Sequence, residues 1–155
     1  MLLFVDSFLY FLSILHGEYQ KKCYGKNLLE KASLFCEEQK KGFEIENVRN
    51  DDYDSYFTTS DGQRNCRIHI KFDKEYDIQR VVLKENIKKS QRIEAFRILT
   101  VHDGSEKCVF EGTVVGYKKI VLLDKIKIKE LVKELVIEII DSRVAPTLSY
   151  IGVFE

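Results

Sequence analysis

The segment "RIHIKFD" (Arg67 to Asp73) decides the fold class, because its apolar and polar side chains alternate without interruption. In an extended chain Ile68, Ile70 and Phe72 point to one side, and the residues between them point to the other. This alternation is typical of an antiparallel strand that has one face in a core and the other in water. It predicts a sheet at the centre of the sequence.

Similar extended runs follow along the chain, and turn residues separate them. They cover residues 77–85, 92–101, 107–123, 133–141 and 148–155. The run 107–123 contains two strands around Gly112 and Gly116, and "HDGS" (102–105) is a tight-turn signal. Pro146 lies between the last two runs, where its missing N–H disturbs no ladder. Many short strands with this punctuation predict a sandwich of two antiparallel sheets.

One stretch, residues 124–140, fits two structures. "IKIK" (126–129) alternates like a strand, whereas "KELVKELV" (129–136) has helical spacing and good helix formers. We interpret the repeated KELV as a short insertion before the strand that follows.

The first 26 residues differ in texture from the rest of the chain. Leu12, Leu15 and Tyr19 recur at helical spacing, which predicts an amino-terminal helix. The apolar run from Phe8 to Leu15 is shorter than the roughly 20 residues that a bilayer requires, and we expect no membrane interaction. No basic segment precedes this run and no small-residue cleavage site follows it, so no signal peptide is predicted. The helix carries more apolar surface than one small sandwich covers, which predicts a further neighbouring surface.

Charge and cysteine usage disfavour two classes of function. The 155 residues contain 25 Lys and Arg against 25 Asp and Glu, so the formal net charge is zero. Nucleic-acid-binding proteins usually carry a basic excess, because phosphate contacts supply much of their affinity, and we expect no nucleic-acid partner. Cys23, Cys36, Cys66 and Cys108 include no CxxC pair and predict no zinc site. Reduced, buried thiols are favoured over disulfides, which points to an intracellular, cytoplasmic setting.

Several segments, in this order, resemble one known family. They are "NLLEKASLF" (27–35), "NDDYDSYFTTSDG" (50–62), "VVLKENIKKSQRIEAFRI" (81–98), "EGTVVGYKKIVLL" (111–123) and "SRVAPTLSYIGVFE" (142–155). Together they are similar to the carboxy-terminal discoidin-like domain (coagulation-factor type C) of bacterial α-L-fucosidases, which are family 29 glycoside hydrolases. The resemblance covers residues 18–155. It implies an all-β fold, an antiparallel β-sandwich of the galactose-binding-like jelly-roll type, over residues 27–155.

The resemblance also implies where the first helix comes from. "GEYQKKCYGKNL" (17–28) is similar to the end of the catalytic domain of those fucosidases. We therefore expect residues 1–26 to be a helical remnant of that domain. Many of those relatives are exported, so the resemblance leaves the cellular compartment open.

The function implied by the resemblance is a non-catalytic one. Retaining glycosidases use two carboxyl groups about 5–5.5 Å apart, and the resemblance places both in a barrel domain upstream of the matched segments. We expect an accessory module, not an enzyme on its own, whose partner is a fucose- or galactose-containing glycan or a glycosidase catalytic domain. The alternative is a structural remnant of a truncated fucosidase that binds no ligand.

Sandwiches of this type bind sugars at loop ends through aromatic faces and polar groups. Tyr53 is the candidate aromatic contact, whereas Tyr56 and Phe57 match a pair that related domains place in the core. A second, polar set could converge on a ligand: Glu85, Gln91, Arg92 and Arg143. The alternative for Glu85 and Arg92 is an ion pair that holds two strands in register.

The family pattern further suggests a structural calcium ion and two special glycines. In "NDDYDS" the oxygen ligands would be Asn50, Asp52 and Ser55. Tyr150 stands where related domains have a glutamate ligand, which weakens such a site, and no other cofactor is expected. Gly112 and Gly116 are expected to let the chain turn sharply. Tyr117 is expected to bury its ring and to keep its hydroxyl for a polar partner.

Overall fold

Residues 11–12, 14–15, 18, 24–124 and 128–155 are described by a computed structural model of the chain. The strands are β1 (Ser33–Phe35), β2 (Phe57–Thr58), β3 (Cys66–Tyr76), β4 (Arg80–Lys84), β5 (Ile93–His102), β6 (Ser105–Gly112), β7 (Lys119–Leu122), β8 (Val132–Ser142), β9 (Thr147–Leu148) and β10 (Tyr150–Phe154). Three short 3-10 helices are η1 (Leu28–Lys31), η2 (Ile45–Arg49) and η3 (Ile87–Lys89).

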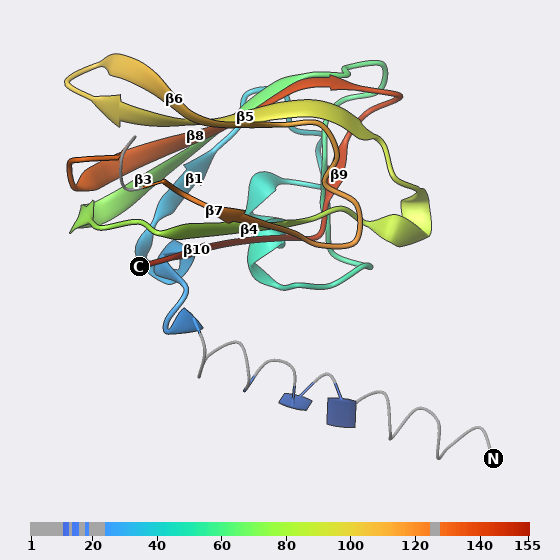
Figure 1. The fold of residues 1–155 in the computed structure, drawn as a ribbon. Coiled ribbons are helices and arrows are strands. Elements are labelled where there is room, and N and C mark those ends of the chain that lie inside the picture. Colours follow the sequence, from blue (N-terminus) through green and yellow to red (C-terminus); the bar gives the residue numbers. More distant parts are fainter. Residues whose placement is uncertain (1–10, 13, 16–17, 19–23, 125–127) are drawn as a thin grey trace.

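The strands form a sandwich, which confirms the predicted fold class. One sheet has the order β1-β3-β8-β5-β6, and the sheet that faces it has the order β10-β4-β7. A two-stranded ladder of β2 and β9 lies at one end (Figure 1). Neighbouring strands pair in an antiparallel manner throughout these sheets.

Strand β3 shows why the alternation is a reliable signal. Ile68 and Ile70 are fully buried, and they pair with Ile137 and Leu135 of β8 across the sheet. The polar residues between them face outward and are partly exposed. The core between the sheets therefore consists of the inward residues of both layers.

The "HDGS" turn is confirmed as a two-residue hairpin between β5 and β6. His102 pairs with Ser105, and the two residues between them, Asp103 and Gly104, have φ values of 48° and 76°. Positive φ at both central positions suits the right-handed twist of the flanking strands, which is why Asp-Gly is favoured there.

The two glycines of the "EGTVVGY" segment have different roles. Gly116 turns the chain, as predicted, with a φ of 64°. Gly112 does not have a positive φ; it ends β6 opposite Phe96, and a Cβ atom there would lie 2.7 Å from the Phe96 ring. The prediction of a turn at Gly112 is wrong, because the position requires close packing of an aromatic ring against the backbone.

In the ambiguous stretch, the described residues 124 and 128–131 are irregular, and residues 132–140 form a strand. β8 begins at Val132, in the middle of "KELVKELV", and it is the central strand of the larger sheet. Pairing with β3 on one side and β5 on the other outweighs the helical propensity of its Lys, Glu and Leu residues. Residues 125–127, which include the first half of "IKIK", lie outside the described residues.

The described part of the amino-terminal segment, residues 11–12, 14–15 and 18, is helical. Apolar side chains there are 44–56% exposed: Phe11, Leu12, Ile14 and Leu15. The other residues of the predicted segment up to residue 23, including Tyr19, lie outside the described residues. No helix within the described residues is both long and apolar enough to cross a bilayer.

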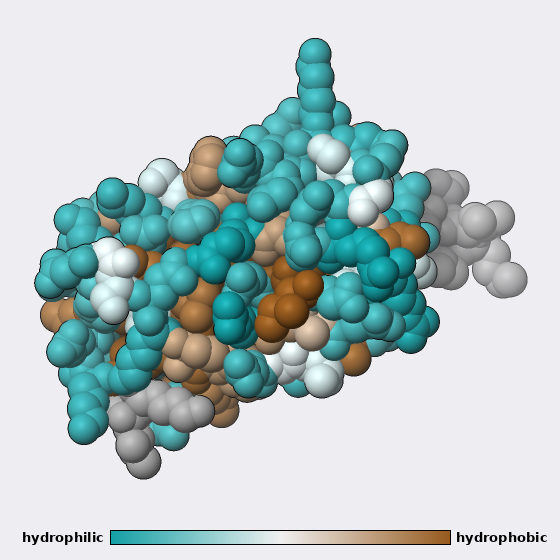
Figure 2. All heavy atoms as spheres, turned by 90° about the horizontal axis from the view of Figure 1, so that it is seen from above, coloured by the Kyte–Doolittle hydropathy of each residue, from teal (hydrophilic) through white to brown (hydrophobic). Residues whose placement is uncertain are grey.

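Tyr24 connects this segment to the smaller sheet. Its ring lies 5.6 Å from the ring of Phe154 in β10, and the Arg80 guanidinium of β4 lies 4.4 Å from its centroid. The segment thus meets the outer face of the β10-β4-β7 sheet. The outer face of the larger sheet, seen in Figure 2, is mostly hydrophilic with apolar areas between.

Candidate functional site

Four loops meet at one end of the sandwich, on the right of Figure 1 where η3 lies. The Asn86 side chain donates a hydrogen bond to the Tyr53 carbonyl oxygen at 2.8 Å, which joins the loop after β4 to the loop that carries Tyr53. The Arg143 backbone N–H donates to the Arg92 carbonyl oxygen at 2.9 Å, which brings in the loop after β8. The structure therefore gathers the predicted polar set at one place.

Glu85 links these loops through hydrogen bonds to its buried carboxylate. Its Oε1 accepts hydrogen bonds from the backbone N–H groups of Arg92 at 2.7 Å and Ile93 at 2.9 Å. Its Oε2 accepts a third from Gly116 at 2.7 Å, and the residue is fully buried. The prediction of Glu85 as a sugar contact is wrong, because backbone donors occupy its carboxylate inside the protein. It does link two strands, through the backbone of Arg92 and not through its guanidinium.

The two predicted arginines have different contacts: Arg92 bonds to backbone carbonyl groups, and Arg143 pairs with a carboxylate. The Arg92 guanidinium donates to the carbonyl oxygens of Lys89 at 3.0 Å and Ala145 at 2.8 Å. The Arg143 side chain is 72% exposed and lies 2.9 Å from a carboxylate oxygen of Glu94. Arg92 is thus held by the fold, whereas Arg143 stays at the surface.

Tyr53 stands beside Lys88, which the sequence did not single out, and near Gln91 and Tyr117, which it did. The Lys88 ammonium lies 5.3 Å from the centroid of its ring. Burial raises the pKa of Tyr53, and the neighbouring Tyr117 and Asp51 raise it further. The Gln91 amide lies 3.8–3.9 Å from where a Cβ atom on Gly116 would stand, next to Tyr117. We call Tyr53, Lys88, Gln91 and Tyr117 the loop-end patch.

Tyr117 corrects one expectation. Its ring is 57% exposed and not buried, because the turn at Gly116 directs the chain away from the sheet before β7 begins at Lys119. A glycine turn followed by an aromatic residue was visible in the sequence, but the direction of the ring depends on the fold. Lys88 had no distinguishing sequence signal beyond a short run of lysines.

The pair predicted to lie in the core is only partly buried. Phe57 is fully buried, as expected. Tyr56 is half-buried, and its ring lies 4.9 Å from that of Phe43. Neither is a member of the loop-end patch.

The predicted calcium ligands are engaged within their own loop. The Asn50 amide donates to the Ser55 hydroxyl at 3.3 Å, and an Asp52 carboxylate oxygen accepts from the Asp54 backbone N–H at 3.0 Å. Calcium takes six to eight oxygen ligands. In the described part of the chain, no cluster of three or more His, Cys, Asp or Glu side chains is arranged to hold a metal.

The positive charge beside this loop comes from a lysine side chain of the protein, that of Lys84. The Lys84 ammonium is 2.7 Å from a carboxylate oxygen of Asp51, and its side chain is only 6% exposed. It also lies 5.1 Å from the ring centroid of Tyr150, the residue found in place of the family glutamate. Burial raises the pKa of Tyr150 to about 12, with a further contribution from Asp51. The residues present therefore do not fit a calcium ion, because Lys84 already supplies the positive charge.

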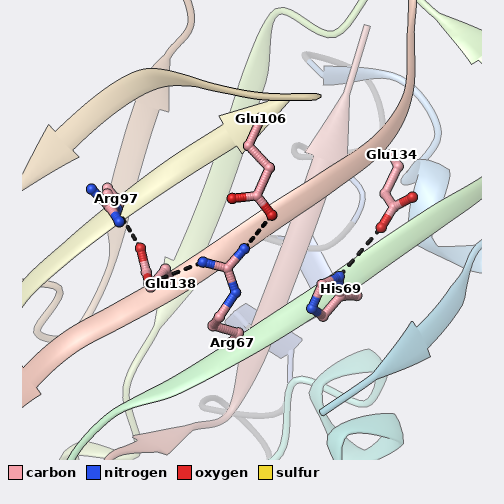
Figure 3. A network of polar contacts seen from close by, with 6 residues as sticks. All are labelled: Arg67, His69, Arg97, Glu106, Glu134 and Glu138. Atoms are coloured by element: carbon pink, nitrogen blue, oxygen red, sulfur yellow. Dashed lines mark hydrogen bonds and ion pairs between the residues drawn. The ribbon is translucent and has the colours of Figure 1, made fainter. Parts of the chain in front are cut away.

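A larger polar network covers the outer face of the five-stranded sheet (Figure 3). It consists of Arg67, His69, Arg97, Glu106, Glu134 and Glu138. Glu138 of β8 accepts hydrogen bonds from Arg67 of β3, at 3.0 Å, and from Arg97 of β5. Arg67 also pairs with Glu106 of β6. The charges satisfy one another across four strands, which makes the network a structural feature of the sheet.

The sequence was compared with models of known protein families and with curated proteins. A family model described as anaphase-promoting complex, subunit 10 (APC10), matches residues 19–96, half of the chain. No curated protein matches the sequence.

Solved structures confirm the resemblance to the fucosidase sandwich. A GH29 fucosidase of Ruminococcus gnavus, solved with fucose, is 26% identical with a TM-score of 0.76, over 90% of this chain and 28% of that one. A putative α-L-fucosidase of Bacteroides thetaiotaomicron is 19% identical with a TM-score of 0.77, over 87% and 30%. The chain thus spans less than a third of the fucosidases it matches, and corresponds to their carboxy-terminal domain.

A separate carbohydrate-binding module shares the same fold. The family 32 module of Clostridium perfringens NanJ, solved with galactose, is 14% identical with a TM-score of 0.68. Here the match covers 83% of this chain and 96% of that one, so the sandwich also exists as a module on its own.

Proposed function

The chain belongs to the family described as anaphase-promoting complex, subunit 10 (APC10), a galactose-binding-like fold, and from this premise we propose that it is a non-catalytic carbohydrate-binding module. The family match ends at residue 96, so it does not include Tyr117. The ligand is therefore argued from the loop-end patch, which is the observation that carries the proposal.

The chemistry of the loop-end patch suits a sugar. Sugar rings have an apolar face that packs against aromatic rings, and hydroxyl groups that need donors and acceptors. Tyr117 offers an exposed ring, and the Gln91 amide beside Gly116 offers both a donor and an acceptor. The Lys88 ammonium, already over the Tyr53 ring, adds hydrogen-bond donors.

The fucose and galactose in the solved relatives suggest the first ligands to test. We expect L-fucose or D-galactose at millimolar concentrations to shift the backbone amide signals of residues 86–92 and 113–118 in an NMR titration. Tyr117→Ala should remove most of the shift. Phe35→Ala is the matched control, because Phe35 is similarly exposed, at 60%, on β1 of the other sheet. Saturating sugar with no shift in these loops would favour the ligand-free alternative.

An observation outside the loops supports a second, docking function. The apolar side chains of the helical residues 11–12 and 14–15 are exposed, and so are Ile120, at 42%, and Leu122, at 70%, in edge strand β7. We propose that this side of the small sheet docks against a family 29 catalytic barrel. A barrel domain expressed separately should bind the chain in calorimetry, and Leu122→Ser should weaken that binding. Binding that is unchanged by the substitution would place the interface elsewhere.

The proposed function includes no hydrolysis by these 155 residues alone. The purified chain should release no product from an aryl α-L-fucoside, and a full-length family 29 fucosidase serves as the positive control. Turnover that follows the chain through purification would contradict this part of the proposal.

A further inference from the structure

Two buried cysteines face the same side of the larger sheet: Cys66 begins β3, and Cys36 directly follows the neighbouring strand β1. In the ladder of β1 with β3, Leu34 pairs with Ile70 and Phe35 with His69. Continuing the alternation turns Cys36 inward, opposite Ile68, and Cys66 is the next inward residue of β3. Their exposed fractions are 1% and 2%.

Glu38 provides an independent measure of how close the two thiols are. One oxygen, Oε2, accepts a hydrogen bond from the Cys36 thiol at 3.4 Å and another from the Arg67 backbone N–H at 3.5 Å. The Cys36 sulfur is therefore beside the peptide that leaves Cys66. The hydrogen bond that the Cys66 thiol makes with Cys36, together with burial, raises the pKa of the Cys66 thiol, as expected for two thiols in contact.

The backbone at this place can close the remaining gap. Diagonal neighbours on paired strands lie about 7–8 Å apart, and a disulfide requires Cα atoms within about 7 Å. β1 ends at Phe35, so Cys36 is no longer held by the ladder. A small shift of one residue brings the pair into bonding range.

We propose that Cys36 and Cys66 are a redox-active pair that forms a disulfide in an oxidising environment, with a small-molecule disulfide such as oxidised glutathione as the oxidant. One protein thiolate attacks the small disulfide and releases one small thiol. The second protein thiolate attacks the resulting mixed disulfide and releases another. One S–S bond breaks, one forms in the protein, and the two protons of the protein thiols end on the two released thiols.

Access to these thiols comes from the position of β1 in the sheet. β1 has three residues and is an edge strand with a single neighbour, β3. Short edge elements open locally at far lower cost than the whole fold. The pair also meets oxidant during folding, before the sheets close over it.

The bond would act on the proposed ligand site at a distance. The segment between the two cysteines includes η2, β2 and the loop that carries Tyr53. A covalent link between its two ends restricts the unfolded chain and stabilises the closed arrangement of that loop. The redox proposal itself does not depend on sugar binding.

The test uses the full chain with Cys23→Ser and Cys108→Ser, which leaves only the proposed pair. The protein is equilibrated with mixtures of reduced and oxidised glutathione, in native buffer and in concentrated urea, then quenched with acid, alkylated and analysed by mass spectrometry. If the fold holds the thiols together, the equilibrium constant for disulfide formation should be at least about tenfold larger in native buffer. An equal or smaller constant in native buffer would overturn the proposal.

The melting temperatures of the oxidised and reduced protein, and of two single-cysteine variants, provide a second test. By the same thermodynamic cycle, the oxidised protein should melt at a temperature higher by roughly 5–10 °C than the reduced protein. Cys36→Ala and Cys66→Ala, in the same background, should each abolish this difference. A difference that persists in either single variant would show that another group is responsible.

Discussion

Glu85 shows how much of the site depends on one buried side chain. Three backbone N–H groups from two loops converge on its carboxylate. Glu85→Gln keeps the shape but places an amide N–H₂ where an acceptor is needed, so we expect a loss of about 2–3 kcal/mol in the free energy of unfolding. Urea denaturation measures this. Glu94→Gln, at a partly exposed ion pair with Arg143, is the control and should change stability by less than about 0.5 kcal/mol.

The position of Lys84 leads to a test of whether the protein binds calcium. If its ammonium supplies the charge beside Asp51, neither EDTA nor millimolar Ca²⁺ should change the melting temperature of the protein. Lys84→Met keeps the packing but removes a nearly buried ion pair, and should cost about 1–3 kcal/mol. A melting temperature that rises with Ca²⁺ in the unmodified protein would show that Asn50, Asp52 and Ser55 do bind the ion.

For individual residues, the sequence predicted which end of the sandwich holds the candidate site, but it did not correctly predict what each side chain contacts. Tyr53, Arg92 and Arg143 do lie at one end of the sandwich, because family motifs fix the loops in which they occur. Glu85 was assigned the wrong role, since sequence does not show whether a carboxylate meets backbone donors or solvent. Tyr117 was assigned the wrong orientation for a similar reason: its ring direction follows from the turn at Gly116.

Between strands, the charge network of the larger sheet makes stability depend on pH. Burial alone would raise the pKa of Glu138, but hydrogen bonds from Arg97 and Arg67 outweigh it and hold that pKa below its ordinary value of 4.5. A carboxyl group with a lowered pKa in the folded state stabilises the fold above its unfolded pKa. The contribution is lost as the pH falls through the folded value.

We therefore expect melting temperatures to separate Glu138→Gln from the unmodified protein at neutral pH and to converge below about pH 4. Thermal unfolding followed by circular dichroism between pH 7 and pH 3 measures the two curves. Glu37→Gln, at an exposed position, should follow the unmodified protein throughout. Parallel curves for Glu138→Gln would mean that the network contributes no pH-dependent stability.

The strands themselves were largely predictable, because alternation survives in any strand that has one face in a core. β3 follows from it directly, whereas β4, β5 and the β5–β6 turn follow from extended apolar runs and the turn residues that separate them. The short elements β1, β2 and the 3-10 helices do not, since two to five residues carry no clear period. β8 was ambiguous because its residues favour a helix locally, and only its place between β3 and β5 decides the outcome.

In the whole molecule, the sandwich is closed at Asn27, where the chain enters the fold. Its side-chain oxygen accepts hydrogen bonds from the backbone N–H groups of Leu29, at 3.1 Å, and Val153, at 3.0 Å, and its amide donates to the Ile151 carbonyl at 3.3 Å. These contacts tie the start of the sandwich to its last strand, β10. In the preceding segment, Tyr24 contacts Phe154 and Lys26 pairs with Glu30 at 3.2 Å; the boundary between residues 26 and 27 stays a prediction.

A chain shortened to residues 24–155 tests this boundary. Because it keeps Asn27 and the contact of Tyr24 with Phe154, we expect its melting temperature to stay within a few degrees of that of the full chain. It should lose the exposed apolar residues 11–12 and 14–15 and with them most of its affinity for a catalytic barrel. The matched comparison is Asn27→Ala in the full chain, which should lower stability while leaving the docking residues in place. A shortened chain that unfolds at room temperature would mean that residues 1–23 belong to the folding unit and are no remnant of another domain.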